Sequence, residues 1–429
     1  MAISWRRWLI ARRISLGPST GFGRRWGARG SHRSRRIRPS NHRRVGSARI
    51  MSAPRRSWFT AADCNIEDLA AIVEKPVQPS DYPLAQRIDS GIVVYDCEDL
   101  RGRLTTSEFR FEVLAEWAFV LDSGPGVLLL AGAYDEPVID AATAVFRSMI
   151  EREKAAGIAA GDHFAAAGVN DRVWNALEKL AIVDPQVFVD YYCNDMLALA
   201  CESWLGPRYQ VTSQLNQVNP GGQAQSPHRD YHLGFLSQEN AQSYPAHTHR
   251  LSPGLTLQGA IAHCDMPIES GPTFLVPNSQ QYEPGYIAWH LPQFREYAEE
   301  HSVQIPLRKG DALFFNPALF HGAGANRSQN IERLGNLLQI SSPFGRAMET
   351  VDRRRIIDAI YPVLLERKQS GASTRALRDV VAASAEGYAF PDDLDIHPPS
   401  GSEPPMAQLD TVLLALEEEW SPEELRDRP

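Results

Sequence analysis

The sequence predicts a mainly β fold in which helices flank a barrel or sandwich of short strands. Between residues 207 and 345, short apolar or alternating segments stand between turn residues, a texture typical of all-β barrels and sandwiches. Before and after this region, apolar residues recur at helical spacing. The chain has 429 residues, of which 43% are hydrophobic, so it can bury one large core.

Local patterns predict the elements one by one. Apolar runs broken by Ser-Gly-Pro-Gly predict strands, and apolar residues spaced three and four apart predict helices. The second helical region is interrupted near Asp184-Pro185. In chain order we expect strands within 114–133, helices at 137–155 and 171–205, short strands from Tyr209 onward, and helices at 347–368, 372–386 and 407–419.

Charge divides the chain near its N-terminus. Residues 1–56 contain sixteen arginines, no lysine and no acidic residue, and the first carboxylate is Asp63. Without those arginines, the 44 basic residues fall to 28 against 52 acidic ones, so the remainder carries a net charge of about −24. A segment that is rich in Arg and Ser, free of acids and poor in clustered apolar residues is typical of an organelle transit peptide.

Two other interpretations of this tail stay open. Met51 begins MSAPRRSWFT, a plausible start, so the preceding residues can be an extension upstream of it. An arm that binds nucleic acid ranks well behind, because the acidic body would repel the same phosphates. We expect a disordered tail at 1–57 and a single domain at 58–429, with a helical part at 58–206, a β core at 207–345 and a helical part at 346–429.

The cysteines indicate a reducing compartment. There are five, an odd number, and none stands in a CxxC pair. This pattern argues against a disulfide framework and against a structural zinc site. No membrane-spanning segment is visible in the sequence, so we expect a cytoplasmic protein, or a mitochondrial or other organellar one if the tail is a transit peptide.

The stretch SPHRDYHLGF at 226–235 has three competing interpretations: a protein kinase loop, part of an iron site, or a polar turn without a role. A kinase loop needs an asparagine five residues after the aspartate. That position holds Phe235, and no glycine-rich phosphate loop precedes it, so the kinase interpretation fails. Because an isolated HxD is more often a solvated turn, the rest of the chain must decide between the other two.

The chain supplies the remaining parts of an iron site. Non-haem Fe(II) oxygenases use two imidazoles and one carboxylate on one face of the metal. Residues two apart in extended backbone point the same way, so His228 and Asp230 can face one ion while Arg229 faces away. His321, at the end of a strand and before flexible glycines, is the candidate third ligand. Arg333, on the next strand, would point into the barrel, where its charge needs an anion such as 2-oxoglutarate.

In this order the motifs resemble the phytanoyl-CoA dioxygenase family of Fe(II)/2-oxoglutarate oxygenases. The resemblance covers about residues 114–345 and rests on NPGGQAQSPHRD, SGPTFLVPNS, GDALFFNPALFHGAGANRS and the downstream arginine. It implies a double-stranded β-helix core (a jelly roll, cupin-like). It also implies iron held by His228, Asp230 and His321, and 2-oxoglutarate anchored by Arg333.

One position departs from the family pattern. The family usually has Ser or Thr two residues after the distal histidine, where it helps to hold the far carboxylate of 2-oxoglutarate. Here the residue is Ala323. We expect Gln217, on the strand before the HxD motif, and Gln258, on the strand after it, to supply the missing help.

The resemblance implies an enzyme that hydroxylates or otherwise oxidises a small organic metabolite, consumes O2 and 2-oxoglutarate, and releases succinate and CO2. Asp230 argues against halogenation, because halogenating relatives lack this carboxylate. Two alternatives stay open: a hydrolase or isomerase that holds zinc and a water molecule on the same ligands, and a non-catalytic jelly-roll binding protein. The acidic body is a poor attractor for the phosphates of coenzyme A, which favours a small-molecule substrate.

Overall fold

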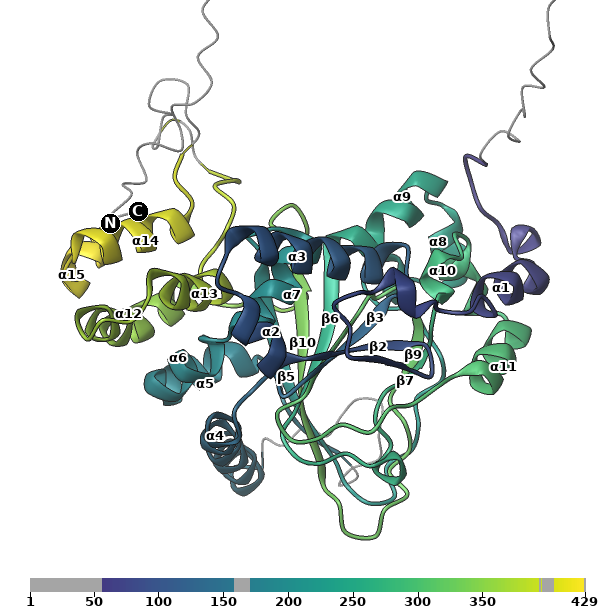
Figure 1. The fold of residues 1–429 in the computed structure, drawn as a ribbon, viewed down its shortest axis with the longest axis horizontal. Helices are drawn as coiled ribbons and strands as arrows, with labels where there is room; N and C mark the ends of the chain where they lie inside the picture. Colours follow the sequence, from purple (N-terminus) through teal and green to yellow (C-terminus); the bar gives the residue numbers. More distant parts are fainter. Residues whose placement is uncertain (1–55, 158–169, 393–394, 396–404, 428–429) are drawn as a thin grey trace, which may run out of the picture. The chain divides into compact units, whose positions relative to one another are not determined.

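The computed structural model describes residues 56–157, 170–392, 395 and 405–427. The expected basic tail therefore lies outside the described residues, apart from its last two positions. Residues 55–429 form one compact unit. In Figure 1, strands occupy the middle of this unit, with the C-terminal helices on one side and α1 and α11 on the other.

The larger sheet has eight strands. Neighbouring strands are antiparallel, except for β2 and β3, which run parallel. In spatial order the strands are β1 (Arg87–Asp89), β2 (Ile92–Asp96), β3 (Val127–Ala131), β8 (Ala312–Phe315), β6 (Thr256–Ala262), β10 (Arg333–Ser341), β5 (Gln210–Val218) and β4 (Asn170–Val173).

A smaller sheet pairs β7 (Phe274–Val276) with β9 (Phe320–Gly322) in antiparallel fashion. Single bridges extend it on both sides, from Leu275 to Val303 and from His321 to His228. The segment that carries the HxD motif therefore lies at one edge of this small sheet, and the segment at Val303 lies at the other. This pairing brings two distant parts of the chain together.

The helices begin at clear local signals. Thr106 caps α3 by accepting a hydrogen bond from the Phe109 N–H (3.2 Å), and Asp184 caps α6, whose first residue is Pro185. Before β5 lie α1 (Ile66–Val73), α2 (Cys97–Arg103), α3 (Ser107–Asp122), α4 (Glu136–Ala155), α5 (Ala176–Val183), α6 (Pro185–Tyr192) and α7 (Asp195–Leu205). After it lie α8 (Gln238–Gln242), α9 (Ala246–Leu251), α10 (Gly285–Ala288), α11 (Pro292–His301), α12 (Arg353–Gln369), α13 (Thr374–Ser384), α14 (Gln408–Glu418) and α15 (Pro422–Arg426).

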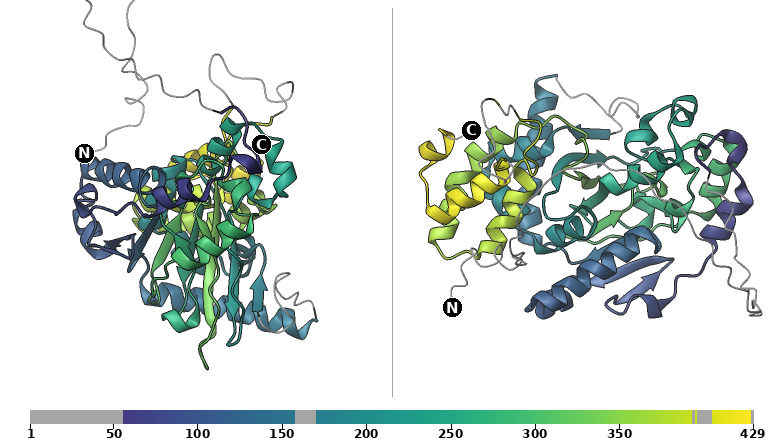
Figure 2. Two further views of the ribbon diagram at one scale, coloured as in Figure 1. Left: turned by 90° about the vertical axis from the view of Figure 1, so that its right-hand side faces the viewer. Right: turned by 90° about the horizontal axis from the view of Figure 1, so that it is seen from above.

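The expectation of a mainly β fold was wrong: the fold is mixed, and helices hold 48% of the described residues. Figure 2 shows helices around the strands in both further views. One cause is the segment 114–122, which forms the second half of α3 instead of a strand. There Val113, Trp117, Val120 and Leu121 are buried at helical spacing, a period that the apolar run obscured. The helix at 137–155, the break near Asp184 and the strands after Tyr209 are confirmed.

The central strands present two different faces. On one face, Val211 and Leu215 of β5 and Leu338 of β10 join the main apolar core, together with Ile356 and Ile360 of α12. The opposite face carries hydrogen-bonding side chains. In register, Gln339 of β10 lies opposite both Thr212 and Gln258, so their side chains share this side. We call it the polar face, defined by Thr212, Gln214, Gln258, Arg333 and Gln339.

Among the described helices, none is both long enough and apolar enough to cross a bilayer.

Candidate active site

The HxD segment and the start of β9 are joined through their backbones. The His228 N–H donates to the His321 carbonyl (3.0 Å), and the His321 N–H donates to the His228 carbonyl (3.1 Å). The Asp230 N–H donates to the carbonyl of Pro317 (3.0 Å). These bonds fix all three predicted ligands relative to one another before any metal arrives.

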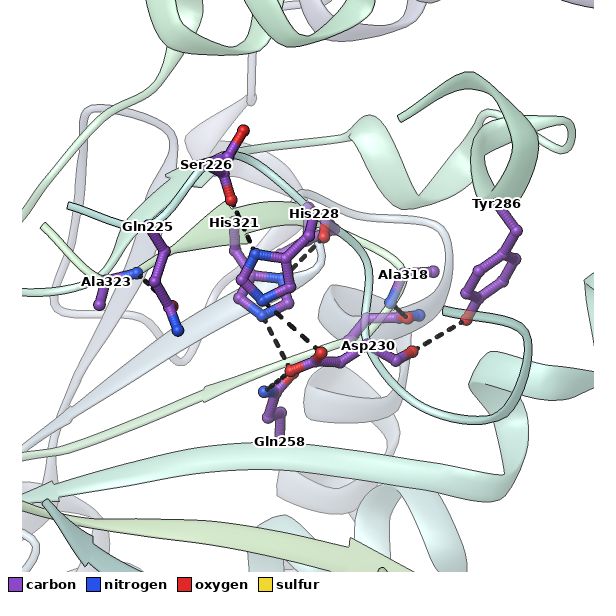
Figure 3. A network of polar contacts seen from close by, with 11 residues as sticks. Gln225, Ser226, His228, Asp230, Gln258, Tyr286, Ala318, His321 and Ala323 are labelled. Carbon is purple, nitrogen blue, oxygen red and sulfur yellow. Dashed lines mark hydrogen bonds and ion pairs between the residues drawn. The ribbon is translucent and has the colours of Figure 1, made fainter. Parts of the chain in front are cut away.

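The three side chains converge on one point (Figure 3). The possible ligand atoms of His228, Asp230 and His321 all lie within 4.8 Å of one another. The Nε2 atom of His228 is 3.6 Å from one oxygen of Asp230, and the Nε2 atom of His321 is 3.3 Å from the other. Two imidazoles and one carboxylate at such separations can hold a divalent transition metal and leave further positions open.

Backbone carbonyls orient both imidazoles. The Nδ1 atom of His228 lies 2.9 Å from the Ser226 carbonyl, and that of His321 lies 2.9 Å from the Leu319 carbonyl. A ring that donates from Nδ1 keeps the lone pair of Nε2 for a metal. Burial, with the positive charge of His321 second, lowers the pKa of His228, so this ring is neutral at neutral pH.

The carboxylate of Asp230 is held ionised and oriented. Burial alone would raise its pKa, but the contact with His321 Nε2 (3.3 Å), the electrostatic interaction with both histidines and the Gln258 amide outweigh it and bring the pKa to about 2. The Nε2 group of Gln258 donates to Asp230 over 2.5 Å. The structure therefore places Gln258 against a predicted metal ligand, in a different position from the one expected beside the far carboxylate of 2-oxoglutarate.

Arg229 anchors the HxD loop from behind. Its guanidinium is fully buried and donates to the carbonyls of Ser279 (2.6 Å) and Tyr282 (3.0 Å). It also lies over the rings of Tyr286 (5.2 Å) and Phe320 (5.0 Å). As the alternation in the sequence predicts, Arg229 points away from His228 and Asp230, but the anchor that it finds there was missed.

Arg333 is buried, with 7% of its surface exposed. Its Nη1 group donates to the carbonyls of Ser270 (3.1 Å) and Gly324 (3.0 Å), and Gly324 lies three residues after His321. Burial lowers its pKa to about 10. Within the described part of the chain, no carboxylate forms an ion pair with it, so a buried positive charge is available to an anion.

Gln217 does not join this arrangement. Its partner in the sheet register is Leu334, so it points to the face opposite that of Arg333. There its amide donates to Asn219 (3.0 Å) and Asp171 (3.3 Å). The expectation that Gln217 assists Arg333 assumed the wrong face, because the register of β5 against β10 cannot be read from the two sequences separately.

Gln225 lies where the family pattern is incomplete. Its side-chain oxygen accepts a hydrogen bond from the Ala323 backbone N–H (3.0 Å), and the backbone N–H of Gln225 donates to the Ala323 carbonyl (2.9 Å). Figure 3 shows the Gln225 amide beside Ala323, with its nitrogen turned away from this contact. No signal in the sequence marked Gln225, since the contact depends on how two loops meet.

A protein-family model and several known proteins match parts of this chain. The family model described as phytanoyl-CoA dioxygenase (PhyH) matches residues 124–334. The dioxygenase andF of Emericella variicolor is 30% identical over 137 residues, covering 31% of this chain and 42% of that protein. The dioxygenase aneA of Aspergillus aculeatus is 26% identical over 169 residues, covering 38% and 49%. The matched region thus spans less than half the length of either relative.

Solved structures also match. The epimerase SnoN in complex with Fe3+, alpha ketoglutarate and nogalamycin RO is 18% identical, with a TM-score of 0.36 and coverage of 70% of this chain and 95% of that chain. HygX from Streptomyces hygroscopicus, with nickel and 2-oxoglutarate bound, is 17% identical, with a TM-score of 0.35 and coverage of 55% and 90%. The family model, which spans both HxD and the distal histidine, carries the assignment: residues 124–334 belong to the phytanoyl-CoA dioxygenase family of non-haem iron, 2-oxoglutarate oxygenases.

Proposed function

We propose that the protein is an Fe(II)- and 2-oxoglutarate-dependent dioxygenase that hydroxylates or otherwise oxidises a small organic metabolite, with release of succinate and CO2. The observation that carries this proposal is the convergence of His228, Asp230 and His321, with ligand atoms within 4.8 Å of one another. Arg333, whose Nη1 group donates to the Gly324 carbonyl three residues after His321, is a buried cation with no acidic partner among the described residues.

We assign His228, Asp230 and His321 as the iron ligands. The donor set fits Fe(II), because both Nε2 atoms are kept free by the carbonyls on Nδ1 and the carboxylate stays ionised. Bound there, iron would supply the oxidising chemistry, in which O2 is consumed and 2-oxoglutarate is converted to succinate and CO2. The protein's own task is to hold the ligands rigidly, and the backbone bonds between the two segments support that role.

Arg333 would hold the far carboxylate of 2-oxoglutarate. Its Nη1 group is occupied by two carbonyls, which fixes the direction of the guanidinium and leaves other N–H groups for a carboxylate. Gln225 would assist, because its contact with Ala323 brings a side-chain amide to the position where relatives use a hydroxyl. We therefore replace Gln217 and Gln258 by Gln225 as the expected second anchor.

We infer that residues 58–429 form one oxygenase domain around a double-stranded β-helix. The strand order β8-β6-β10-β5 in the large sheet supports this inference. So does the small sheet, in which the HxD segment, β9, β7 and the segment at Val303 follow one another. Two four-membered arrays of this kind are what a jelly roll requires.

The test is turnover of purified protein with Fe(II) and 2-oxoglutarate. We expect iron-dependent formation of succinate, together with a weak visible charge-transfer band under anaerobic conditions. His321→Ala should abolish both, whereas His247→Ala, which changes an exposed histidine, should abolish neither. Absence of the band and of succinate from the unaltered protein with a panel of substrates would refute the proposal, as would full activity of His321→Ala.

A further inference from the structure

Three buried polar atoms along or near the polar face lack a hydrogen-bond partner. They are the phenol oxygen of Tyr231, the amide oxygen of Gln258 and one carboxylate oxygen of Glu349. Gln258 contacts the proposed iron ligand Asp230, and Tyr231 follows Asp230 in the chain. A buried polar atom without a partner costs roughly 1–3 kcal/mol. Native structures rarely keep such atoms, so three of them on the side of the sheet that leads to a proposed reaction centre indicate a molecule that completes their bonding.

A row of amide side chains crosses the polar face from Asp230 to the edge strand β4. Gln258, which donates to Asp230, lies opposite Gln339 in the sheet register. The Gln214 amide donates to the oxygen of Gln339 (3.2 Å), and Arg172 of the edge strand β4 donates to the oxygen of Gln214 (3.3 Å). Polar side chains therefore continue from the ligand carboxylate to the edge of the sheet, where an apolar core would otherwise be expected.

Glu349 lies at the far end of this row. One of its oxygens accepts a hydrogen bond from the backbone N–H of Asn175 (2.9 Å), two residues beyond β4. Burial raises its pKa, while the Asn175 N–H and the Gln214 amide oppose that rise. Tyr231 is 4% exposed and directly follows Asp230 in the chain.

The chemistry of the three atoms identifies what they can bind. The Gln258 amide cannot turn round, because its NH2 group faces the carboxylate of Asp230, so its oxygen remains an acceptor. An ionised Glu349 is an acceptor as well, and only Tyr231 can also donate. At neutral pH, 2-oxoglutarate has two carboxylates and a keto group, all acceptors, so it can accept from Tyr231 but cannot satisfy Gln258 or Glu349. The missing molecule must donate hydrogen bonds.

We propose that Tyr231, Gln258 and Glu349 bind the substrate, and that the substrate is a small molecule that presents hydroxyl or protonated amine groups to them. This inference rests on the proposed function, since it places the substrate beside the proposed iron. A long acyl chain has no donor and would leave all three atoms unpaired. The substrate class is therefore hydroxylated or aminated, in contrast to a fatty acyl group.

The experiment uses full-length protein with Fe(II) and 2-oxoglutarate, whose binding is first established by anaerobic titration. Three groups of compounds are then compared for stimulated succinate formation: polyols and sugars, aminocyclitols and amino sugars, and fatty acyl-CoA thioesters. We expect stimulation only from the first two groups. Tyr231→Phe should reduce kcat/KM for the active compound by about tenfold, the equivalent of a lost hydrogen bond of roughly 1.4 kcal/mol.

Glu349→Gln distinguishes the two donor types. The amide keeps an acceptor but loses the charge, so a hydroxylated substrate should lose less than tenfold in kcat/KM and a protonated amine about a hundredfold, as expected for a hydrogen bond between charged groups. Glu300→Gln, at an exposed glutamate, is the matched control and should change nothing.

Each contrary result has a definite meaning. Stimulation confined to acyl-CoA thioesters overturns the substrate class. So does a protein that binds 2-oxoglutarate but responds to neither donor group. If both Tyr231→Phe and Glu349→Gln retain kcat/KM within twofold, the assigned residues are wrong. Failure of the unaltered protein to bind 2-oxoglutarate with Fe(II) instead refutes the proposed function, and this inference with it.

Discussion

Replacing Arg333 by methionine should separate the binding role of this residue from its effect on stability. The side chain is 7% exposed, and burial lowers its pKa from the usual range to about 10. At 1.36 kcal/mol per pKa unit, keeping the guanidinium charged costs the empty protein roughly 3 kcal/mol. A carboxylate that pairs with Arg333 recovers much of this cost and adds charge-assisted hydrogen bonds.

For Arg333→Met we therefore expect 2-oxoglutarate to bind about a hundredfold or more weakly, since 1.4 kcal/mol corresponds to a factor of ten. The empty protein should lose some stability, as in Arg353→Met, because the carbonyls of Ser270 and Gly324 lose their donor; the loss is limited because methionine has a similar volume and carries no buried charge. Arg333→Lys keeps the charge but loses the fork geometry, so its affinity should fall between the two.

The assay is anaerobic titration of 2-oxoglutarate into Fe(II)-loaded protein, together with melting temperatures with and without 2-oxoglutarate. Arg353 provides a matched control. It is also buried, burial likewise lowers its pKa to about 10, and its guanidinium donates to the carbonyls of Ser384 (3.1 Å) and Val211 (3.0 Å). Arg353→Met should lower the melting temperature of the empty protein and leave the affinity for 2-oxoglutarate within twofold.

Two outcomes would refute this reasoning. The first is an Arg333→Met protein that binds 2-oxoglutarate as tightly as the unaltered protein, which would show that the buried charge does not meet the ligand. The second is an equal loss of affinity in Arg353→Met, which would trace the effect to general damage. A drop in stability confined to Arg333→Met, without any change in affinity, would assign the residue a purely structural role.

Three further predictions concern the surroundings of the site. Gln225→Ala should raise the KM for 2-oxoglutarate about fivefold, as expected for one hydrogen bond of about 1 kcal/mol, in steady-state assays. Gly285→Ala would place a Cβ atom 1.9 Å from Cζ of Arg229. Overpacking of this kind should reduce the free energy of unfolding by about 1–3 kcal/mol and weaken Fe(II) binding. The control is Gly254→Ala, because no atom lies within 4 Å of the Cβ position there. Burial lowers the pKa of His263 to about 3, so between pH 3 and 6.5 the unfolded chain binds a proton that the folded one does not. The free energy of unfolding should therefore fall as the pH drops from about 6.5 towards 3, by up to about 1.4 kcal/mol per pH unit. His263→Gln should remove this dependence on pH in denaturant titrations.

The convergence of His228, Asp230 and His321 could be predicted because it depends on local rules. The two-residue period of extended backbone puts His228 and Asp230 on one side and Arg229 on the other, whatever the rest of the chain does. His321 was found because it stands between a predicted strand and a run of glycines; in the structure it is the middle residue of β9. In the structure these residues meet through reciprocal backbone hydrogen bonds, a contact that the sequence implied without specifying.

The supporting residues could not be predicted in the same way. Whether Gln217 and Arg333 share a face depends on the register between β5 and β10, and a shift of one residue would reverse the answer. The contact of Gln225 with Ala323 depends on the path of two loops. The helix at 107–122 was misjudged for another reason: its apolar residues are dense enough to satisfy both the strand and the helix period.

The strand pattern of the sequence did not show that both faces of β5 are buried, one apolar and one polar. On β5, Val211 and Leu215 face the helices and contribute to the core, while Thr212 and Gln214 alternate with them and face the proposed reaction centre. Buried amides contribute less to folding than apolar residues of similar size unless every donor and acceptor is paired. Their oxygens and nitrogens are paired only in part here, so their presence on a central strand is better accounted for by binding than by stability. The same alternation that identifies a strand in the sequence thus also marks the face that we propose for binding.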